Sequence, residues 1–494
     1  MIILSLIEKD AAVVNRLLIS PPDGADAVEV RLDAMKHREP SRWFPGSAVA
    51  KRPVLASCRS RKDGGLFAGS EKSRGEALLS AARAGVAYVD IEFESACMKM
   101  LPDLAHAQIM LSHHDRRRTP RASELFARYR KMAAIPGVAV VKIVTTATDP
   151  ADILEIRQLL DRAASGKVPL LALAMGEPGV PSRILAKSWG SWGTYVSLRK
   201  GAETAPGQIT LEEATDLYRV AEIDEETRLA GITGHPIAHS LSPVIHNAAY
   251  HHQRINFRYL PFPSPSVDRL PDLMRKLGIR GLSVTSPHKI AFARKIRQLD
   301  PFAARAGAVN TVLRAGGKLM GFNTDAEGLL HPLRARIDPA GKIAVVLGSG
   351  GAARAVALAL HDAGASVLVC SRRERQGIEV ARLASGRYVA PRRLAKEAYD
   401  ILVNATPVGM DGRSMPVSSA ALKGSLIADL IYHPVRTPLL AAALARGIST
   451  LGGLDILLAQ AIEQYPLLTG RSAPVEVMRD ALLAASREPV GAEA

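Results

Sequence analysis

The stretch Lys342-Ile-Ala-Val-Val-Leu-Gly-Ser-Gly-Gly-Ala-Ala-Arg-Ala355 decides the fold of the second half of the chain. An apolar segment over 342–347 leads into a glycine turn, and a run of small, helix-forming residues follows. Strand, glycine turn and helix in this order are the context that the dinucleotide-binding fingerprint requires. Gly348 permits the tight turn, Gly350 lets a pyrophosphate approach the backbone, and Ala353 allows close helix packing. The sequence therefore predicts a Rossmann unit with a pyrophosphate at the helix N-terminus.

The turn after the next predicted strand indicates which dinucleotide is bound. The strand 366–370 ends in Ser371-Arg372-Arg373, where an NAD site would usually carry Asp or Glu for the ribose hydroxyls. A hydroxyl and two guanidinium groups suit a 2′-phosphate, so we predict NADP; a solvated basic turn is the alternative. The residues expected to bind the cofactor are Gly348, Ser349, Gly350, Gly351, Ala352, Ser371, Arg372, Arg373, Asn404 and Thr406.

The first half of the chain alternates apolar and helical segments. Eight short segments are almost continuously apolar, which is typical of strands buried on both faces. Helical stretches such as 74–84, 121–134 and 150–164 lie between them. This alternation predicts a (β/α)8 TIM barrel, an α/β fold, with an open doubly wound sheet as the alternative. The expected strands are 2–7, 27–32, 53–58, 88–93, 108–112, 138–144, 169–174 and 194–198.

The length of the chain predicts several domains. It has 494 residues, against roughly 100–200 for a typical domain. A polar, acidic stretch after the eighth strand is expected to be a linker. We expect the barrel over 1–221, the linker over 222–228, a substrate-binding domain over 229–335 completed by a C-terminal helix at about 455–486, and the Rossmann domain over 336–454.

Composition narrows the class of protein. The net charge is +16, but basic residues are spread along the chain, and aromatic residues make up only 4%, too few for a nucleic-acid stacking platform. No apolar run reaches the ~18 residues of a membrane helix, and the first residues do not form a signal peptide. Three scattered cysteines suggest neither disulfides nor a zinc site. We therefore expect a cytoplasmic protein without a metal, whose basic surface attracts anionic small molecules.

Polar side chains gather where barrel strands are expected to end, and such ends carry catalytic groups. Lys142 stands out because Val and Ile flank it inside a buried strand, where a charged amine is costly. Desolvation favours the neutral amine, which can form a Schiff base with a ketone; a lysine that reaches solvent at the strand end is the alternative. His114 is a candidate proton shuttle. The candidate carboxylate clamps are Arg31, Arg59 and Arg183.

Five segments of the first half resemble type I 3-dehydroquinate dehydratase, in that family's order and over essentially residues 1–220. They are 29–33, 58–65, 112–115, 141–143 and 205–208. The resemblance implies that Lys142 forms an imine with the substrate ketone. It also implies that His114 removes a proton from the neighbouring carbon and later protonates the departing hydroxyl. The implied substrate-binding residues are Glu29, Arg31, Arg59, Asp63, Arg183, Thr204 and Gln208.

The first half departs from this family at two positions. The family usually has Glu where this chain has Asp63, which puts the reach of that carboxylate toward His114 in question. It usually has Ser where this chain has Thr204, which keeps the hydroxyl. A class I aldolase, which also uses a barrel lysine imine, is the alternative, although 200–204 is a weak match to the phosphate-binding turn that would favour it.

Ahead of the Rossmann unit, the second half carries four polar clusters. They lie at 234–247, 283–289, 308–311 and 321–325, and each ends or follows a short apolar segment. Their hydroxyls, amides and Lys/Asp pair suit a pocket for a polyhydroxylated acid, although each alone would fit a turn or a helix cap. Together they resemble shikimate dehydrogenase, over residues 229 to about 480.

The second resemblance implies specific roles. Lys289 and Asp325 form the acid/base pair, and Lys289 supplies the proton as NADPH delivers hydride to the ketone. Gly453 approaches the nicotinamide. Ser283 stands where many members carry Asn, which leaves the bonding of the ring hydroxyls open. The implied substrate-binding residues are Ser240, Ser242, Thr285, Asn310, Asp325, Tyr432 and Gln460.

Both resemblances together predict a bifunctional enzyme of the shikimate pathway. Its first domain would convert 3-dehydroquinate to 3-dehydroshikimate, and its second would reduce that product to shikimate with NADPH. A quinate dehydrogenase is the close alternative for the second half. An NADPH-dependent redox regulator or nucleic-acid-associated protein with an inactive barrel is a more distant one, supported only by Asp63 and the high basicity.

Overall fold

The computed structural model describes residues 1–104 and 106–487. The chain forms two compact units, one built mainly from residues 1–227 and the other mainly from residue 228 onward. Each unit has its own sheets and its own core.

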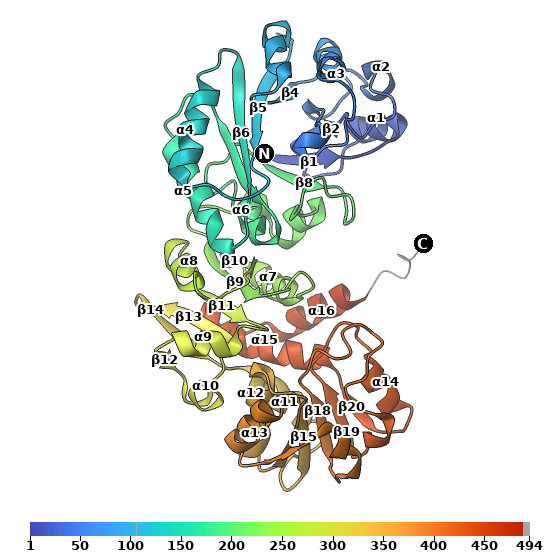
Figure 1. Cartoon of the computed structure of the whole chain (residues 1–494), viewed down its shortest axis with the longest axis vertical. Coiled ribbons are helices and arrows are strands. Elements are labelled where there is room, and N and C mark those ends of the chain that lie inside the picture. The colour runs from blue at the N-terminus through green and yellow to red at the C-terminus, as the bar shows by residue number, and fades with distance from the viewer. Residues whose placement is uncertain (105, 488–494) are drawn as a thin grey trace. The chain divides into compact units, whose positions relative to one another are not determined.

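The first unit is an eight-stranded parallel sheet with the order β7-β6-β5-β4-β3-β2-β1-β8. Its strands are buried along nearly their whole length because helices cover the outside and side chains fill the inside, which explains the continuous apolar runs. The predicted (β/α)8 barrel is confirmed (Figure 1). The strands are β1 (Ile2–Leu6), β2 (Ala27–Arg31), β3 (Val54–Ser57), β4 (Tyr88–Glu92), β5 (Gln108–His114), β6 (Val138–Thr146), β7 (Leu170–Met175) and β8 (Thr194–Ser197).

The barrel helices begin and end at ordinary capping residues. The Ser70 hydroxyl accepts a hydrogen bond from the Ser73 amide at the start of α3, and Asp149 and Asp152 form a capping box before α5. The helices are α1 (Ala11–Ile19), α2 (Pro40–Trp43), α3 (Glu71–Arg83), α4 (Ala122–Ala133), α5 (Ile153–Ala163) and α6 (Val180–Ile184), with short turns η1 (Arg61–Asp63), η2 (Ala96–Leu104), η3 (Pro150–Asp152), η4 (Glu177–Gly179), η5 (Glu213–Leu217) and η6 (Val220–Glu222).

The second unit contains two six-stranded sheets, of which the first is mixed. Its order is β10-β9-β11-β13-β14-β12, with β11 parallel to β9 and antiparallel to β13. The last two helices of the chain pack into the core of this sheet, which places the red α15 and α16 beside its green and yellow strands in Figure 1. Its elements are β9 (Arg228–Gly234), β10 (Phe257–Pro263), β11 (Gly281–Val284), β12 (Gln298–Leu299), β13 (Thr311–Ala315), β14 (Lys318–Phe322), α7 (Ser242–His252), α8 (Leu270–Lys276), α9 (Lys289–Lys295), α10 (Pro301–Ala306), α11 (Asp325–Arg334), α15 (Gly453–Thr469) and α16 (Val475–Ser486).

The other sheet is parallel throughout, with the order β17-β16-β15-β18-β19-β20. Numbered along the chain, this is the 3-2-1-4-5-6 order of a Rossmann fold, whose ligands bind beyond the carboxyl ends of the strands. Its elements are β15 (Ile343–Leu347), β16 (Ser366–Cys370), β17 (Arg387–Val389), β18 (Ile401–Asn404), β19 (Leu426–Asp429), β20 (Ser449–Leu451), α12 (Gly351–Asp362), α13 (Glu374–Leu383), α14 (Pro438–Leu444), η7 (Pro391–Lys396) and η8 (Ser419–Ala421). Within the described part of the chain, none of the helices is both long and apolar enough to cross a membrane.

Candidate active sites

Lys142 lies in the middle of β6 and points into the barrel, where only 5% of it is exposed. Its Nζ is 3.2 Å from Asp90 Oδ2 and 4.0 Å from the centre of the Tyr195 ring. Burial lowers the pKa of Lys142 and Arg59 acts in the same direction, whereas Asp90 only partly opposes them. The barrel thus holds an amine that gives up its proton more readily than an ordinary lysine, as a nucleophile requires.

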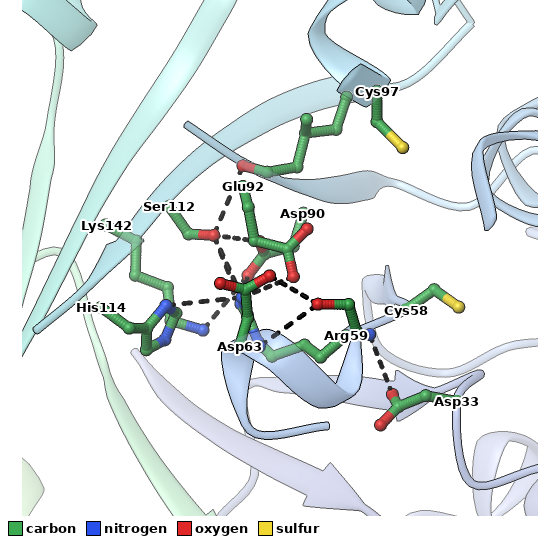
Figure 2. A network of polar contacts seen from close by, with 12 residues as sticks. Asp33, Cys58, Arg59, Asp63, Asp90, Glu92, Cys97, Ser112, His114 and Lys142 are labelled. Carbon is green, nitrogen blue, oxygen red and sulfur yellow. Dashed lines mark hydrogen bonds and ion pairs between the residues drawn. The ribbon is translucent and has the colours of Figure 1, made fainter. Parts of the chain in front are cut away.

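Two acidic residues of β4 organise the charges around this amine. Asp90 and Glu92 are two positions apart, so both point into the barrel. Arg59 NH2 lies 2.5 Å from Asp90 Oδ2, and Arg59 NH1 lies 3.4 Å from Glu92 Oε1. Burial acts to raise the pKa of Asp90, but the adjacent Arg59 and Lys142 cations outweigh it and lower that pKa. Figure 2 shows Arg59 at the centre of this network.

His114 ends β5, beside the strand that carries Lys142, and shares the same network (Figure 2). Its Nδ1 lies 3.4 Å from Arg59 NH1. Burial, together with the Arg59 and Lys142 cations, lowers the pKa of His114 well below its usual range, so the imidazole is neutral and able to accept a proton. The neighbouring His113 instead has its Nδ1 3.5 Å from Arg128 on α4, because successive strand residues face opposite ways.

Asp63 makes its hydrogen bonds within its own turn. Its Oδ2 accepts a hydrogen bond of 2.6 Å from the Ser60 hydroxyl, and its backbone amide donates to the same hydroxyl. Within the described residues, no hydrogen bond or ion pair links Asp63 to His114. The side chain that contacts the His114 ring is Arg59, through its NH1 group.

On the opposite side of the barrel, β1, β2 and the loop after β8 are linked by a chain of hydrogen bonds. The Ser5 hydroxyl donates to Glu29, and Thr204 Oγ1 lies 3.2 Å from Ser5 Oγ. The Gln208 side-chain oxygen accepts from both the amide and the hydroxyl of Thr204. Three of the predicted residues, Glu29, Thr204 and Gln208, therefore lie in one polar chain.

The two other predicted arginines are held differently from each other. Arg31 makes two hydrogen bonds to Asp33, of 2.9 and 2.7 Å, so its charge is already matched by a carboxylate. Arg183 is 1% exposed, donates to the Pro206 carbonyl at 3.3 Å, and leaves its Nε without a hydrogen-bond partner. Burial lowers the pKa of Arg183 to about 10. A buried guanidinium that no carboxylate of the described chain neutralises is suited to an anionic ligand.

In the second unit, α9 and α11 begin at the proposed acid/base pair. Lys289 Nζ forms an ion pair with Asp325 Oδ2, and their side chains are 15% and 11% exposed. Asn310 Nδ2 donates to Asp325 Oδ1 at 2.8 Å and to the side-chain oxygen of Gln460 on α15 at 3.3 Å. The structure thus brings four of the predicted residues into direct contact across three helices and a loop.

Ser283 and Gln464 extend this network into the core. The Ser283 hydroxyl accepts a 2.5 Å hydrogen bond from Tyr259 and donates one of 2.8 Å to Gln464. Gln464 also donates to Thr311 Oγ1 at 2.7 Å. Gln464 was not predicted from the sequence as part of this network. Its position one helical turn after Gln460 places both side chains on the same face of α15, which was a signal in the sequence.

The remaining residues predicted to bind the substrate lie at or beside the ends of elements of the second unit. The Ser242 amide donates to Ser240 Oγ at 3.3 Å at the start of α7, and the Tyr432 hydroxyl interacts with Ser240. Thr285 directly follows β11 and its backbone amide donates to the Thr233 carbonyl at 2.9 Å. These hydroxyls, buried at Ser242 and half-buried at the other three residues, are groups of the kind that hydrogen-bond a polar ligand.

The glycine turn after β15 lies against the proposed acid/base pair. Gly348 has φ +117°, which favours glycine. A Cβ on Gly350 would meet nothing within 4 Å, so the backbone there is open to a ligand at the N-terminus of α12. A Cβ on Gly351 would lie only 2.6 Å from Lys289 Cβ. The glycine turn and the start of α9, which carries Lys289, are therefore direct neighbours.

Two other segments supply predicted cofactor residues at the carboxyl ends of neighbouring strands of the same sheet. Ser371 is buried and donates to the Arg373 carbonyl, whereas the Arg372 and Arg373 side chains are exposed after β16. Asn404 Oδ1 accepts from the Thr406 hydroxyl at 2.7 Å. Open backbone at the turn and exposed guanidinium groups beside it fit a dinucleotide that carries a 2′-phosphate.

Family models match both halves of the chain. The model for type I 3-dehydroquinase matches residues 2–225, that for the shikimate dehydrogenase substrate binding domain residues 232–312, and that for the shikimate 5′-dehydrogenase C-terminal domain residues 453–483. A chloroplastic bifunctional 3-dehydroquinate dehydratase/shikimate dehydrogenase of Arabidopsis thaliana is 33% identical over 486 residues, covering 92% of this chain and 79% of the relative.

Two further proteins are similar to the second half alone. An NADP(+) shikimate dehydrogenase of Moorella thermoacetica is 42% identical over 288 residues, which cover 55% of this chain and 96% of that protein. A solved shikimate dehydrogenase in complex with NADP+ is 31% identical, with a TM-score of 0.51, and the match covers 54% of this chain and 98% of that structure.

Proposed function

Because the chain belongs to the family of bifunctional 3-dehydroquinate dehydratase/shikimate dehydrogenases, we propose that Lys142 and His114 carry out the first reaction and that Lys289 and Asp325 carry out the second. The barrel would convert 3-dehydroquinate to 3-dehydroshikimate, and the second unit would reduce that ketone to shikimate. The observation that carries the proposal is the buried Lys142 amine, whose pKa is lowered and which shares one charge network with a neutral His114.

The dehydration follows from the placement of these two groups. The neutral Lys142 amine attacks the substrate ketone, loss of water gives an imine, and the imine takes up a proton from water and thereby acidifies the adjacent carbon. His114 takes a proton from that carbon and then donates it to the departing hydroxyl, which leaves as water. Hydrolysis of the imine returns the amine. Arg183, without a carboxylate of its own, is the proposed partner of the substrate carboxylate.

The cofactor of the second reaction is NADP(H), as in the dehydrogenases to which this half is similar. The turn from Gly348 to Gly351 would hold the pyrophosphate, and Arg372 and Arg373 the 2′-phosphate. When bound, the reduced dinucleotide supplies a hydride. Lys289 would donate a proton to the ketone oxygen as it becomes an alcohol, while Asp325 holds the ammonium group in place and Asn310 orients Asp325.

Borohydride trapping tests the proposed first step. The intact chain is incubated with 3-dehydroquinate and borohydride and freed of both reagents. Both activities are assayed on one portion, and a second portion is digested and mapped by mass spectrometry. We expect a reduced adduct on Lys142, loss of dehydration, and retained reduction of 3-dehydroshikimate, because the second site uses no imine. An adduct on another lysine would contradict the proposed role of Lys142.

Arg372→Ala should lower kcat/KM for NADPH by about 10- to 100-fold, because a hydrogen bond to a charged group contributes about 1.5–3 kcal/mol. Activity with NADH, which lacks the 2′-phosphate, should stay unchanged. Arg382→Ala, an exposed arginine in the last turn of the following helix, is the matched control. Equal losses with both cofactors would indicate that Arg372 does not contact the 2′-phosphate.

Two broader expectations also belong to the proposal. The three cysteines are free and buried, which suits a reducing compartment, so we place the protein in the cytoplasm. Its partners would be the small-molecule substrates and NADP(H), bound at basic and hydroxyl-lined sites.

A further inference from the structure

Asp429 is a buried carboxylate at the carboxyl end of β19 that plays no part in the mechanism above. It is 0% exposed, and no Lys, Arg or His of the described residues forms an ion pair with it. Burial raises the pKa of Asp429 to about 6. Burying a charged carboxylate costs free energy of folding. Asp429 accepts hydrogen bonds that an apolar residue could not accept, and these bonds hold particular segments of the chain.

The first oxygen of Asp429 fixes the side chain of Asn404. Oδ1 accepts a 3.0 Å hydrogen bond from Asn404 Nδ2, which also donates to the Val408 carbonyl at 3.2 Å. With its amino group held there, Asn404 must turn its oxygen toward Thr406, whose amide and hydroxyl donate to it at 3.1 and 2.7 Å. Asp429 therefore sets the conformation of the loop after β18.

The same carboxylate also holds both ends of the loop after β19. Oδ1 accepts from the Ile431 amide at 3.1 Å, and Oδ2 accepts from Thr437 Oγ1 at 2.7 Å. Thr437 is the N-cap of α14. The loop held in this way carries Tyr432, which interacts with Ser240 of the substrate pocket.

This second loop also borders the start of α15. A Cβ on Gly453 would collide with the Ile431 carbonyl and would lie 2.7 Å from the Tyr432 amide. The backbone at the start of α15, the helix that carries Gln460, thus packs directly on the loop that Asp429 holds. One carboxylate links the loop of Asn404 to the loop of Tyr432.

We propose that Asp429 is a positioning residue that holds the Asn404 and Tyr432 loops in the geometry that aligns the reduced ring of the dinucleotide with the substrate ketone. It acts through these loops and touches neither molecule. The inference rests on the proposed function of the second unit. It differs from that function in assigning the alignment of the two reactants to a side chain outside the Lys289 and Asp325 pair.

Asp429→Ala tests this role by separating ring alignment from cofactor anchoring. Loop displacement of about 1 Å can lower a rate about 100-fold, so we expect kcat for 3-dehydroshikimate reduction to fall by about 30- to 100-fold. The dissociation constant of adenosine 2′,5′-bisphosphate, a fragment without the nicotinamide, should change less than about twofold, because its proposed contacts lie near Arg372. A primary isotope effect with NADPH deuterated at the transferred position should increase.

Three variants serve as controls for this experiment. Thr437→Val removes one donor to Asp429 and should give a smaller loss of kcat, whereas Thr437→Ser keeps the hydroxyl and should restore most of it. Glu379→Ala removes an exposed carboxylate of α13, in the same domain but outside both loops, and should have no effect. Dehydration of 3-dehydroquinate by the same polypeptide should stay unchanged throughout.

The possible outcomes distinguish the two proposals. A kcat within threefold of wild type in Asp429→Ala would overturn the positioning role. Parallel loss of fragment binding and kcat would also overturn it, because it would mean that the whole Rossmann domain is disrupted. A wild-type chain that does not reduce 3-dehydroshikimate would instead contradict the proposed function of the second unit.

Discussion

Replacing Lys142 with methionine should lower the rate of dehydration on the order of 10⁴-fold or more and leave NADPH-dependent reduction of 3-dehydroshikimate unchanged. Methionine keeps the apolar stem of the side chain, but it has no amine to attack the ketone. The barrel should remain folded because Asp90 keeps its 2.5 Å contact with Arg59 after the lysine is lost. Dehydration and reduction are measured separately, each with its own substrate.

Lys131→Met, an exposed lysine on α4 of the same barrel, is the matched control for this variant. It should keep full dehydration activity. If Lys142→Met retained dehydration within tenfold of wild type, the imine mechanism would be wrong, and general acid–base catalysis by His114 alone would have to explain the reaction.

Replacing Lys289 with methionine should lower kcat for reduction of 3-dehydroshikimate by about 10²- to 10⁴-fold, the usual contribution of a general acid. The loss should appear mainly in kcat, because Asn310 and Gln460, the proposed binding partners of the substrate hydroxyls, stay in place. Asp325→Asn should give a similar loss, since the ammonium group would no longer be held by a carboxylate. Steady-state kinetics with both substrates check these expectations.

Lys295→Met provides the control for the second site, because Lys295 lies on the same short helix and forms an exposed ion pair with Asp268. Its reduction activity should match wild type, and dehydration should be unchanged in all three variants. A Lys289→Met variant whose only defect is a higher KM for the ketone would show that Lys289 binds the substrate without donating the proton.

Much of the fold was predictable because each half has a strong local signal. Barrel strands buried on both faces are apolar throughout, and the glycine turn at Gly348 sits between a clear strand and a clear helix. The same apolar runs made Lys142, within β6, and His114, at the end of β5, candidate catalytic residues, because polar side chains are conspicuous there. Here the residues that form a motif are close in sequence, so the pattern is visible without the structure.

Some contacts around the site could not be predicted because they join residues that are distant in the sequence. Ser283 bonds Gln464, which is 181 positions later, and no local pattern indicates that pairing. Asp90 and Glu92 do leave a signal, since two acids two positions apart in a buried strand must share an inward face. The direction of the Asp63 carboxylate could not be predicted without the conformation of its turn, because that carboxylate accepts a hydrogen bond from Ser60.

The return of α15 to the mixed sheet has a consequence for the order in which the protein matures on the ribosome. The barrel is built almost wholly from residues that precede the second unit in the chain, so it can fold before that unit has been synthesised. The mixed sheet, in contrast, lacks part of its core until the Rossmann domain has been translated and α15 has emerged. A translating chain should therefore acquire its two activities at different times, with dehydration well ahead of reduction.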